Sequence, residues 1–260
     1  MTSSSQRPPL LFVHGGYMQA GCWAVNFLPW FRDRGYACHA IDLPGHGRRA
    51  QRGDRAALDG YGLDDYVADV ADTVAQLDAP PVLIGHSMGA IVVQRYLEQA
   101  DARAAGLALL APVPPTGLLG ASIQLNARQP DFLREAARAV RGVYTENTVR
   151  VMRAVYFSPD VTDAEFAAFP PLVQDESTRA VAELTALPLS LPRRRRRLPA
   201  LVMGGSHDAL FPANLLHFTA SGWNAETCVI PRAGHMLMMD PQWPLAAEKL
   251  AGWLERLTTP

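Results

Sequence analysis

A serine between two glycines, at positions 85–89, has the spacing of an activated nucleophile. These residues read Gly85-His86-Ser87-Met88-Gly89. An apolar run precedes them and a stretch of helical character follows, which is the strand–turn–helix context that gives the motif its meaning. Glycines on both sides leave the space that such a sharp turn needs. The pattern predicts a nucleophile at Ser87, exposed above the edge of a sheet and close to the free N–H groups of the following helix.

A serine hydroxyl is a weak nucleophile at neutral pH, so it needs a base and a group that orients the base. Downstream of Ser87, one buried-strand pattern leads into Asp208 and a later one leads to His235. His235 is the predicted general base, and Asp208 is the carboxylate predicted to orient it. Asp240 competes with Asp208 for this role. An Asp followed by a Pro suits the start of a helix, however, so we favour Asp208.

The elements that must position these residues alternate along the chain. Short apolar runs predict buried strands, and amphipathic stretches predict helices. The apolar runs lie at 10–13, 37–43, 81–85, 106–111, 201–205 and 227–231. The main helical stretches lie at 23–34, 66–77 and 90–97. This alternation predicts an α/β fold with a mostly parallel central sheet that helices cover on both faces.

The alternation is interrupted once, after a proline-rich stretch. The segment 116–197 shows helical patterns and no convincing strand. We therefore predict a core formed by residues 1–115 and 198–260, with a helical cap inserted at 116–197. Five consecutive arginines, Arg193 to Arg197, end the cap. We interpret them as a solvated connector rather than as an anion-binding or membrane-surface patch.

With these features the chain resembles the serine α/β-hydrolase superfamily, in particular its esterase-like members with a helical cap. The resemblance covers nearly the whole length. Besides the serine motif it rests on Phe12-Val13-His14-Gly15-Gly16, Asp42-Leu43-Pro44-Gly45-His46-Gly47, Gly205-Ser206-His207-Asp208 and Gly234-His235. The order Ser87, Asp208, His235 is also the order of that superfamily. The resemblance implies the α/β-hydrolase fold and cleavage of a carboxylic ester, or a related acyl bond, through an acyl-enzyme.

The same resemblance implies an oxyanion hole and a substrate pocket. Negative charge forms on the substrate carbonyl oxygen during attack, and two N–H donors commonly stabilise it. The amide of Met88 would supply one. The resemblance places the other at Gly16, with Tyr17 as the less favoured alternative. The Tyr17 hydroxyl, together with Tyr144 and Phe157 of the cap, is a candidate for contact with the substrate, which we expect to be a small molecule with an apolar portion.

Composition and missing motifs argue against nucleic-acid binding, a disulfide framework, bound metals or cofactors, and a membrane span. The formal net charge is −1, so no global field selects nucleic acid. The cysteines, Cys22, Cys38 and Cys228, are too scattered to indicate a disulfide framework or a zinc site. Glycine motifs for nucleotides or flavins and paired metal-ligand motifs are missing, so we expect no cofactor and no metal. The short polar N-terminus lacks an apolar signal region, and no apolar run reaches membrane-spanning length, which predicts a cytoplasmic protein.

Alternative functions stay open at this point. A lyase or a carbon–carbon bond hydrolase could use the same triad, since the region 234–238 somewhat resembles the hydroxynitrile lyase and plant methylesterase branch. The only lysine, Lys249, is poorly placed to serve a lyase. A non-catalytic ligand receptor is disfavoured by the complete triad, and a haloperoxidase-like side activity without a cofactor is a further possibility. A serine at position 87 disfavours haloalkane dehalogenase and epoxide hydrolase chemistry. The physiological substrate and the oligomeric state are not determined by the sequence.

Overall fold

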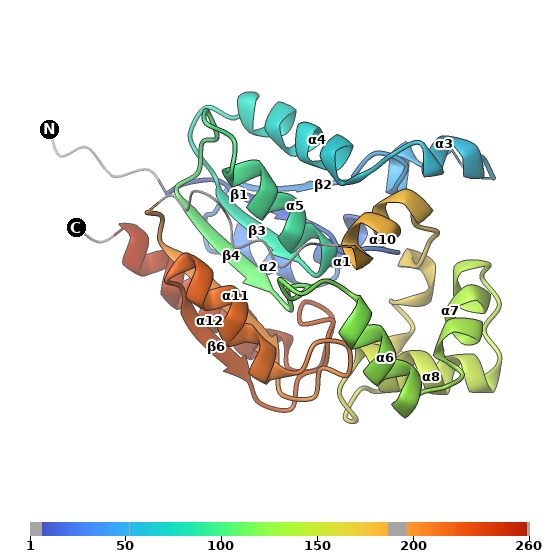
Figure 1. Cartoon of the computed structure of the whole chain (residues 1–260). Coiled ribbons are helices and arrows are strands. Elements are labelled where there is room, and N and C mark those ends of the chain that lie inside the picture. The colour runs from blue at the N-terminus through green and yellow to red at the C-terminus, as the bar shows by residue number, and fades with distance from the viewer. Residues whose placement is uncertain (1–6, 52, 187–196, 259–260) are drawn as a thin grey trace, which may run out of the picture.

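A six-stranded parallel sheet forms the centre of the molecule. The structure, a computed structural model, describes residues 7–51, 53–186 and 197–258. The strand order is β2-β1-β3-β4-β5-β6, with every neighbouring pair parallel. The strands are β1 (Leu10–Val13), β2 (Cys38–Ile41), β3 (Val82–His86), β4 (Gly106–Leu110), β5 (Ala200–Gly205) and β6 (Glu226–Ile230). This sheet confirms the predicted parallel α/β architecture (Figure 1).

The central strands are continuous apolar runs because both faces of the sheet are covered. Successive side chains of a strand point to opposite faces. In β1, Leu10 and Phe12 therefore pack into one hydrophobic core, whereas Leu11 and Val13 pack into a second one. All four side chains have no exposed surface. Removing this much apolar surface from water on both faces is the main stabilising contribution that the sheet can make.

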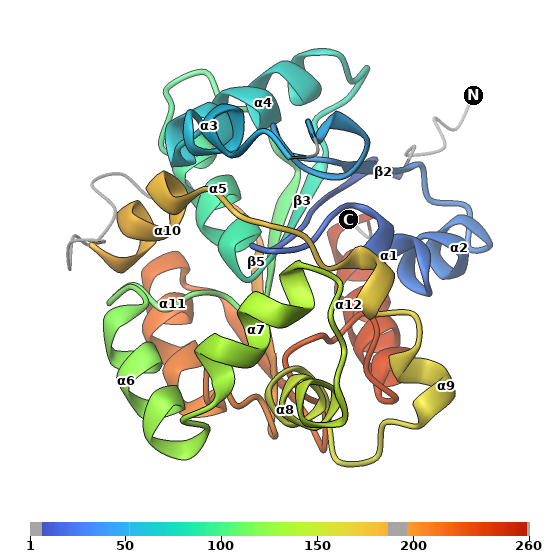
Figure 2. The same cartoon turned by 90° about the vertical axis from the view of Figure 1, so that its right-hand side faces the viewer.

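Helices form a layer on each face of the sheet, as the view in Figure 2 shows. One face carries α1 (Gly21–Ala24), α2 (Phe27–Arg32) and α12 (Trp243–Thr258). The other carries α4 (Leu63–Ala75), α5 (Met88–Leu97) and α11 (Leu216–Trp223). The short helix α3 (Arg55–Asp59) lies beside α10 (Thr178–Thr185). The three cysteines are all free thiols.

The helix predicted at 23–34 is two helices, α1 and α2, so the single-helix prediction was wrong. Pro29 explains the break. Proline has no N–H to donate to Val25, and its ring would clash with that carbonyl inside a continuous helix. A new helix that starts at Phe27 instead places Pro29 in its first turn, where a missing N–H costs little.

The chain between β4 and β5 leaves the sheet, and we refer to this segment as the cap. Its described residues, 111–186 and 197–199, contain no strand, and its helices lie beyond the carboxyl ends of the strands (Figure 1). These helices are α6 (Leu119–Arg128), α7 (Phe132–Val140), α8 (Glu146–Tyr156), α9 (Asp163–Phe166) and α10. Arg193 to Arg196 lie outside the described residues, so the prediction for the arginine run stays a prediction. None of the described helices combines the length and the apolar character needed to span a membrane.

Candidate active site

Ser87 occupies a strained turn between a strand and a helix. β3 ends at His86 and α5 begins at Met88, so the turn consists of Ser87 alone. Its φ of 52° and ψ of −116° lie in a region that non-glycine residues rarely adopt. The Ser87 amide donates to the carbonyl oxygen of Leu110 at 3.0 Å, which helps to hold this conformation. Such strain persists only where the surroundings impose it, and it concentrates at functional sites.

The flanking glycines are required by close backbone contacts. A Cβ atom on Gly85 would lie 2.5 Å from the carbonyl oxygen of Gly89. A Cβ atom on Gly89 would lie 2.4 Å from the carbonyl oxygen of His14. Backbone atoms cannot move away as a flexible side chain can. The motif therefore packs the turn against the loop after β1, where Gly16 lies.

His235 and Asp208 form a buried pair at the ends of neighbouring strands. Asp208 follows β5 and His235 follows β6, and these strands pair directly. Nδ1 of His235 lies 2.9 Å from Oδ2 of Asp208. The other oxygen of Asp208 accepts the amides of Leu210 and Phe211 at 2.8 and 2.9 Å. An ionised carboxylate only accepts hydrogen bonds, so Nδ1 carries the proton and Nε2 of His235 is left as the basic nitrogen.

Aromatic side chains fix the position of the His235 ring. Its centroid lies 4.8 Å from that of His86, 5.3 Å from that of Phe211 and 6.1 Å from that of Tyr156, which belongs to the cap. Nε2 of His86 lies 3.1 Å from the carbonyl oxygen of His235 and therefore donates to it. Burial holds the pKa of His86 well below its ordinary value, so this ring is neutral. His86 braces the loop that carries His235 and does not compete with it as a base.

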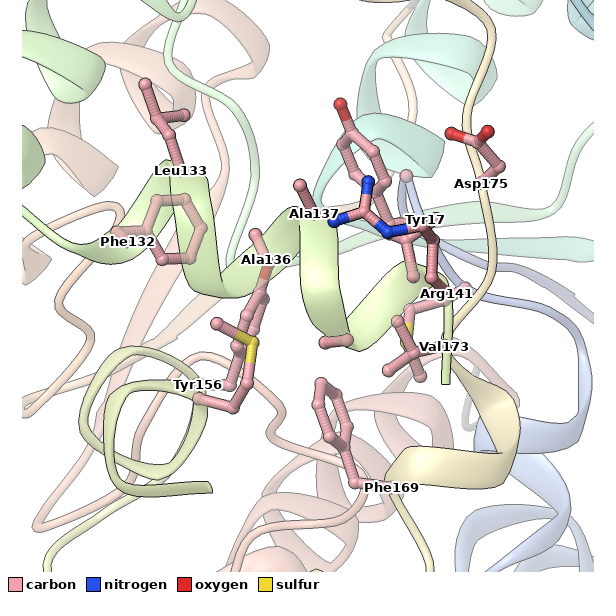
Figure 3. A pocket seen from close by; sticks show the side chains of 15 residues that line it. Tyr17, Phe132, Leu133, Ala136, Ala137, Arg141, Tyr156, Phe169, Val173 and Asp175 are labelled. Carbon is pink, nitrogen blue, oxygen red and sulfur yellow. The ribbon is translucent and has the colours of Figure 1, made fainter. Parts of the chain in front are cut away.

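A cavity of about 190 Å³ brings Ser87 and His235 together with Gly16 and Met88. A second cavity of about 390 Å³ adjoins it and shares with it Phe132, Leu133 and Tyr156 of the cap. Figure 3 shows Phe132, Leu133 and Ala136 along α7, with Tyr156 and Phe169 on the other side of this second cavity. The lining of both cavities is predominantly apolar. Together they form a pocket that can hold an apolar group beside Ser87.

Backbone contacts distinguish the two candidates for the second oxyanion donor. The Tyr17 amide donates to Oε2 of Glu176 at 3.2 Å. In the described part of the chain, the amides of Gly16 and Met88 donate to no protein acceptor. A donor that already has a carboxylate partner is not free to bind a substrate oxygen. The geometry therefore favours Gly16 over Tyr17, which lines both cavities with its side chain.

Two of the residues predicted to contact the substrate do not line these cavities. Neither Tyr144 nor Phe157 lines either one. Phe157 packs inside the cap, with its ring centroid 5.7 Å from that of Phe166 and 5.2 Å from that of Phe169. Tyr144 packs at the edge of the same core. Phe132 and Tyr156 take their place, because the packing of α7 against α8 decides which side of each helix meets the cavity.

The carboxylate that binds the His235 ring is Asp208, whereas the Asp240 carboxylate binds backbone amides. Its Oδ2 accepts the amide of Ser158 at 2.7 Å and that of Gly234 at 3.0 Å. Its Oδ1 accepts the amide of Gln242 at 3.0 Å, in the turn before α12, which begins at Trp243 rather than at position 241. Burial raises the pKa of Asp240. This carboxylate joins the cap to the loop that carries His235.

Glu176 is a polar residue of this site that the sequence did not indicate. It is fully buried and lines the cavity that contains Ser87. Its side-chain partners His46 and Tyr66 lie 130 and 110 positions away in the sequence, so no local pattern marks it. Within the described ranges of the chain, no cluster of three or more His, Cys, Asp or Glu side chains is arranged to hold a metal ion.

This fold and this arrangement of side chains define a class of protein. Residues 10–247 match the model of the alpha/beta hydrolase family, and the chain belongs to that family. Over 270 aligned residues, it is 29% identical to the dihydrolipoyllysine-residue acetyltransferase component of the acetoin cleaving system of Pseudomonas putida, covering 94% of this chain and 62% of that protein. It is 38% identical over 109 residues to a non-heme haloperoxidase of Rhodococcus erythropolis, covering 41% of this chain and 38% of that protein. The chain thus spans less than two thirds of the length of these curated relatives.

Solved structures agree with the family assignment. The chain superimposes on a provisionally named non-heme bromoperoxidase of Mycobacterium tuberculosis H37Rv with a TM-score of 0.74 and 25% identity, covering 97% of this chain and 93% of that one. A thermophilic esterase of Thermogutta terrifontis gives a TM-score of 0.69 at 20% identity, covering 97% and 91% of the two chains. The second likeness shows the shared fold alone.

Proposed function

We propose that this protein hydrolyses a carboxylic ester through an acyl-enzyme on Ser87, with His235 as the base and Asp208 as its orienting carboxylate. The observation that carries the proposal is the buried contact of 2.9 Å between Nδ1 of His235 and Oδ2 of Asp208, beside a cavity that Ser87 also lines. Because Nδ1 faces Asp208, Nε2 is the ring nitrogen of His235 that would take the hydroxyl proton.

The chemical steps follow from these roles. As the oxygen of Ser87 attacks the carbonyl carbon, its proton moves to Nε2 of His235 and a tetrahedral intermediate forms. The intermediate collapses, the alcohol leaves, and His235 returns the proton to the leaving oxygen. A water molecule then attacks the acyl-enzyme with His235 as base, which releases the acid and restores Ser87. Asp208 stabilises the imidazolium in both halves of the reaction.

The amides of Gly16 and Met88 are the proposed donors to the oxyanion. Both residues line the cavity beside Ser87, and both amides lack acceptors in the described part of the protein. Met88 is also the first residue of α5, so the positive end of the helix dipole adds to its effect. Each donor of this kind contributes roughly 3–4 kcal/mol to stabilising the transition state.

The pocket supports a small substrate with an apolar portion. The apolar walls between α7 and α8 suit an acyl chain or an apolar alcohol, and Phe132 and Tyr156 stand between the two cavities. A lyase has less support, because no lysine lines either cavity and Lys249 is exposed on α12. The complete set of catalytic groups argues against a ligand receptor without catalytic activity.

Perhydrolysis is a second candidate that the relatives favour. Several of them are named non-heme haloperoxidases or chloroperoxidases, and one is named a bifunctional esterase/perhydrolase. The same acyl-enzyme serves both reactions, because hydrogen peroxide can replace water as the second nucleophile and release a peracid. Adding peroxide to the ester assay and detecting the peracid would separate the two outcomes.

Ester hydrolysis is tested with p-nitrophenyl acetate and longer p-nitrophenyl esters. Wild-type protein is expected to turn these over, and Ser87→Ala is expected to lose at least about 10⁴-fold in kcat. Equal rates in the two proteins would end the esterase proposal.

A further inference from the structure

We propose that Glu176 of the cap positions the oxyanion hole, and that it does so as the anionic half of a buried ion pair with His46. This inference rests on the proposed function. It concerns a residue that touches none of the reacting atoms in the proposed mechanism and acts through the loop that carries Gly16 and Tyr17.

The carboxylate of Glu176 has four donors. Its Oε2 lies 3.1 Å from Nε2 of His46 and accepts the Tyr17 amide at 3.2 Å. Its Oε1 accepts the Tyr66 hydroxyl and the Ser177 amide, both at 2.8 Å. Glu176 and His46 have no exposed side-chain surface. A buried carboxylate with donors on both oxygens is satisfied as an anion.

Hydrogen-bond partners show that His46 is the cation of the pair. Its Nδ1 lies 3.0 Å from the carbonyl oxygen of Pro44, and its Nε2 faces the Glu176 carboxylate. Both partners are acceptors, so both ring nitrogens carry a proton. Burial acts to lower the pKa of His46, but the hydrogen bond and the charge of Glu176 outweigh it and raise the pKa.

The neighbouring His14 provides a contrast. Its ring centroid is 5.1 Å from that of His46, yet its Nε2 accepts the Leu43 amide at 3.1 Å. That nitrogen therefore has no proton, and the ring is neutral. Burial and the charge of His46 lower the pKa of His14 to about 4. Of these two neighbouring rings, His46 is therefore the cation, and it faces Glu176.

The pair lies close to the proposed oxyanion hole. A Cβ atom on Gly16 would be 3.3 Å from Oε2 of Glu176, and Glu176 lines the cavity that contains Ser87. An unpaired carboxylate at this place would oppose the negative charge that forms on the substrate oxygen. The imidazolium of His46 neutralises it, so the carboxylate can hold the loop without that penalty.

Glu176 holds a backbone that would otherwise relax. Tyr17 has a φ of 62°, which is strained for a residue with a side chain. Its amide is fixed by Glu176, and its carbonyl oxygen accepts the amide of Gln174 at 2.9 Å. The side chain of Gln174 in turn accepts the Gly47 amide at 2.9 Å. The cap segment 174–176 therefore fixes the peptide that follows Gly16, and with it the direction of the Gly16 amide.

The test compares Glu176→Gln, His46→Gln and the double variant in the full chain. Each is assayed for kcat and KM on a p-nitrophenyl ester and for the affinity of a boronic acid, which forms a tetrahedral adduct on the serine. Glu176→Gln is expected to lower kcat by roughly 10- to 100-fold with KM changed less than about threefold, and boronate affinity should fall by the factor lost in kcat/KM. His46→Gln should lower kcat and boronate affinity more than the double variant does, because His46→Gln leaves the buried carboxylate of Glu176 without its cation.

Glu135→Gln is the matched control. Glu135 is also fully buried in the cap and pairs with Arg138 and Thr148, but it lines neither cavity. The Glu135→Gln variant should have a lower free energy of unfolding than the wild type, with little change in boronate affinity. The proposal is overturned if Glu176→Gln behaves like this control, or if the double variant is no better than His46→Gln. Failure of the proposed function would look different, since the wild type itself would then show no activity that depends on Ser87.

Discussion

Nδ1 of His235 lies 2.9 Å from Oδ2 of Asp208, although 27 positions separate the two residues in the sequence. Two adjacent parallel strands, β5 and β6, make this contact possible by ending at the same edge of the sheet. Because Asp208 also accepts two backbone amides, its position does not depend on His235. The carboxylate is a preorganised partner that fixes the tautomer of the ring.

The two carboxylates near His235 should respond differently to amidation. Asp208→Asn is expected to lower kcat by about 10⁴-fold with little change in fold, because an amide can donate to Nδ1 and favour the wrong tautomer. Asp240→Asn should mainly lower the melting temperature, since Asp240 binds the Ser158 and Gly234 amides but not the ring. Steady-state kinetics and thermal unfolding of both variants check this. A larger loss of kcat in Asp240→Asn would reverse the assignment.

The second cavity should control chain length. Ala136→Phe adds a ring to the cavity of about 390 Å³. We expect kcat/KM for p-nitrophenyl octanoate to fall by roughly 10-fold or more, while that for the acetate changes little, because the short acyl group needs only the space beside Ser87. Leu119→Phe is a suitable control, since Leu119 is 58% exposed and lines neither cavity. Parallel losses on both esters would show that this cavity does not bind the chain.

The glycines of the turn can be tested through stability. Gly89→Ala would bring Cβ to 2.4 Å from a backbone oxygen of His14, so we expect a loss of about 3 kcal/mol or more in the free energy of unfolding. Gly252→Ala lies in the interior of α12 with no atom within 4 Å of the new Cβ, and it should gain roughly 0.5–1 kcal/mol. Urea denaturation measures both. A Gly89→Ala protein as stable as the wild type would contradict the close packing of the turn.

The Glu176–His46 pair predicts a pH dependence of stability with a definite sign. The pKa of Glu176 is lowered: burial opposes this, but His46 and its other donors outweigh burial. Its contribution is therefore present above its ordinary value of 4.5 and is lost as the pH falls through the lowered pKa. The pKa of His46 is raised, so its contribution is present below 6.5 and is lost as the pH rises through the raised pKa.

The free energy of unfolding of the wild type minus that of the double variant at positions 46 and 176 should therefore be largest between about pH 5 and 6.5, and it should shrink toward about pH 9. The same difference for Glu135→Gln should stay flat over this range, because its arginine partners do not titrate there. A difference that stays flat, or that rises with pH over this range, would show that folding does not raise the pKa of His46.

Much of the fold could be predicted because it depends on local patterns. β1 was predicted with its observed bounds, since a buried parallel strand is a continuous apolar run. The loops that carry Asp208 and His235 were predicted from the strand-like runs before them. The structure adds that β5 and β6 are parallel neighbours, so both loops leave the same edge of the sheet. The sharp turn at Ser87 could be predicted because only glycines fit at the positions on either side of it.

The cap could not be predicted at the same level. Phe157 and Phe132 look alike in the sequence, yet Phe157 is enclosed by Phe166 and Phe169, whereas Phe132 faces the cavity. Which side of a cap helix meets the substrate depends on how the helices pack on one another, and periodicity carries no information on that. Glu176 was missed for a similar reason, because its charge has meaning only beside His46.

The most direct test of the mechanism is the labelling of the protein by a p-nitrophenyl phosphonate, followed by peptide mass spectrometry. We expect one phosphonyl group per chain, located on Ser87, and a labelling rate that falls by at least about 10³-fold in His235→Gln. Label on another residue, or an unchanged rate in His235→Gln, would contradict the role of His235 as the base that activates Ser87.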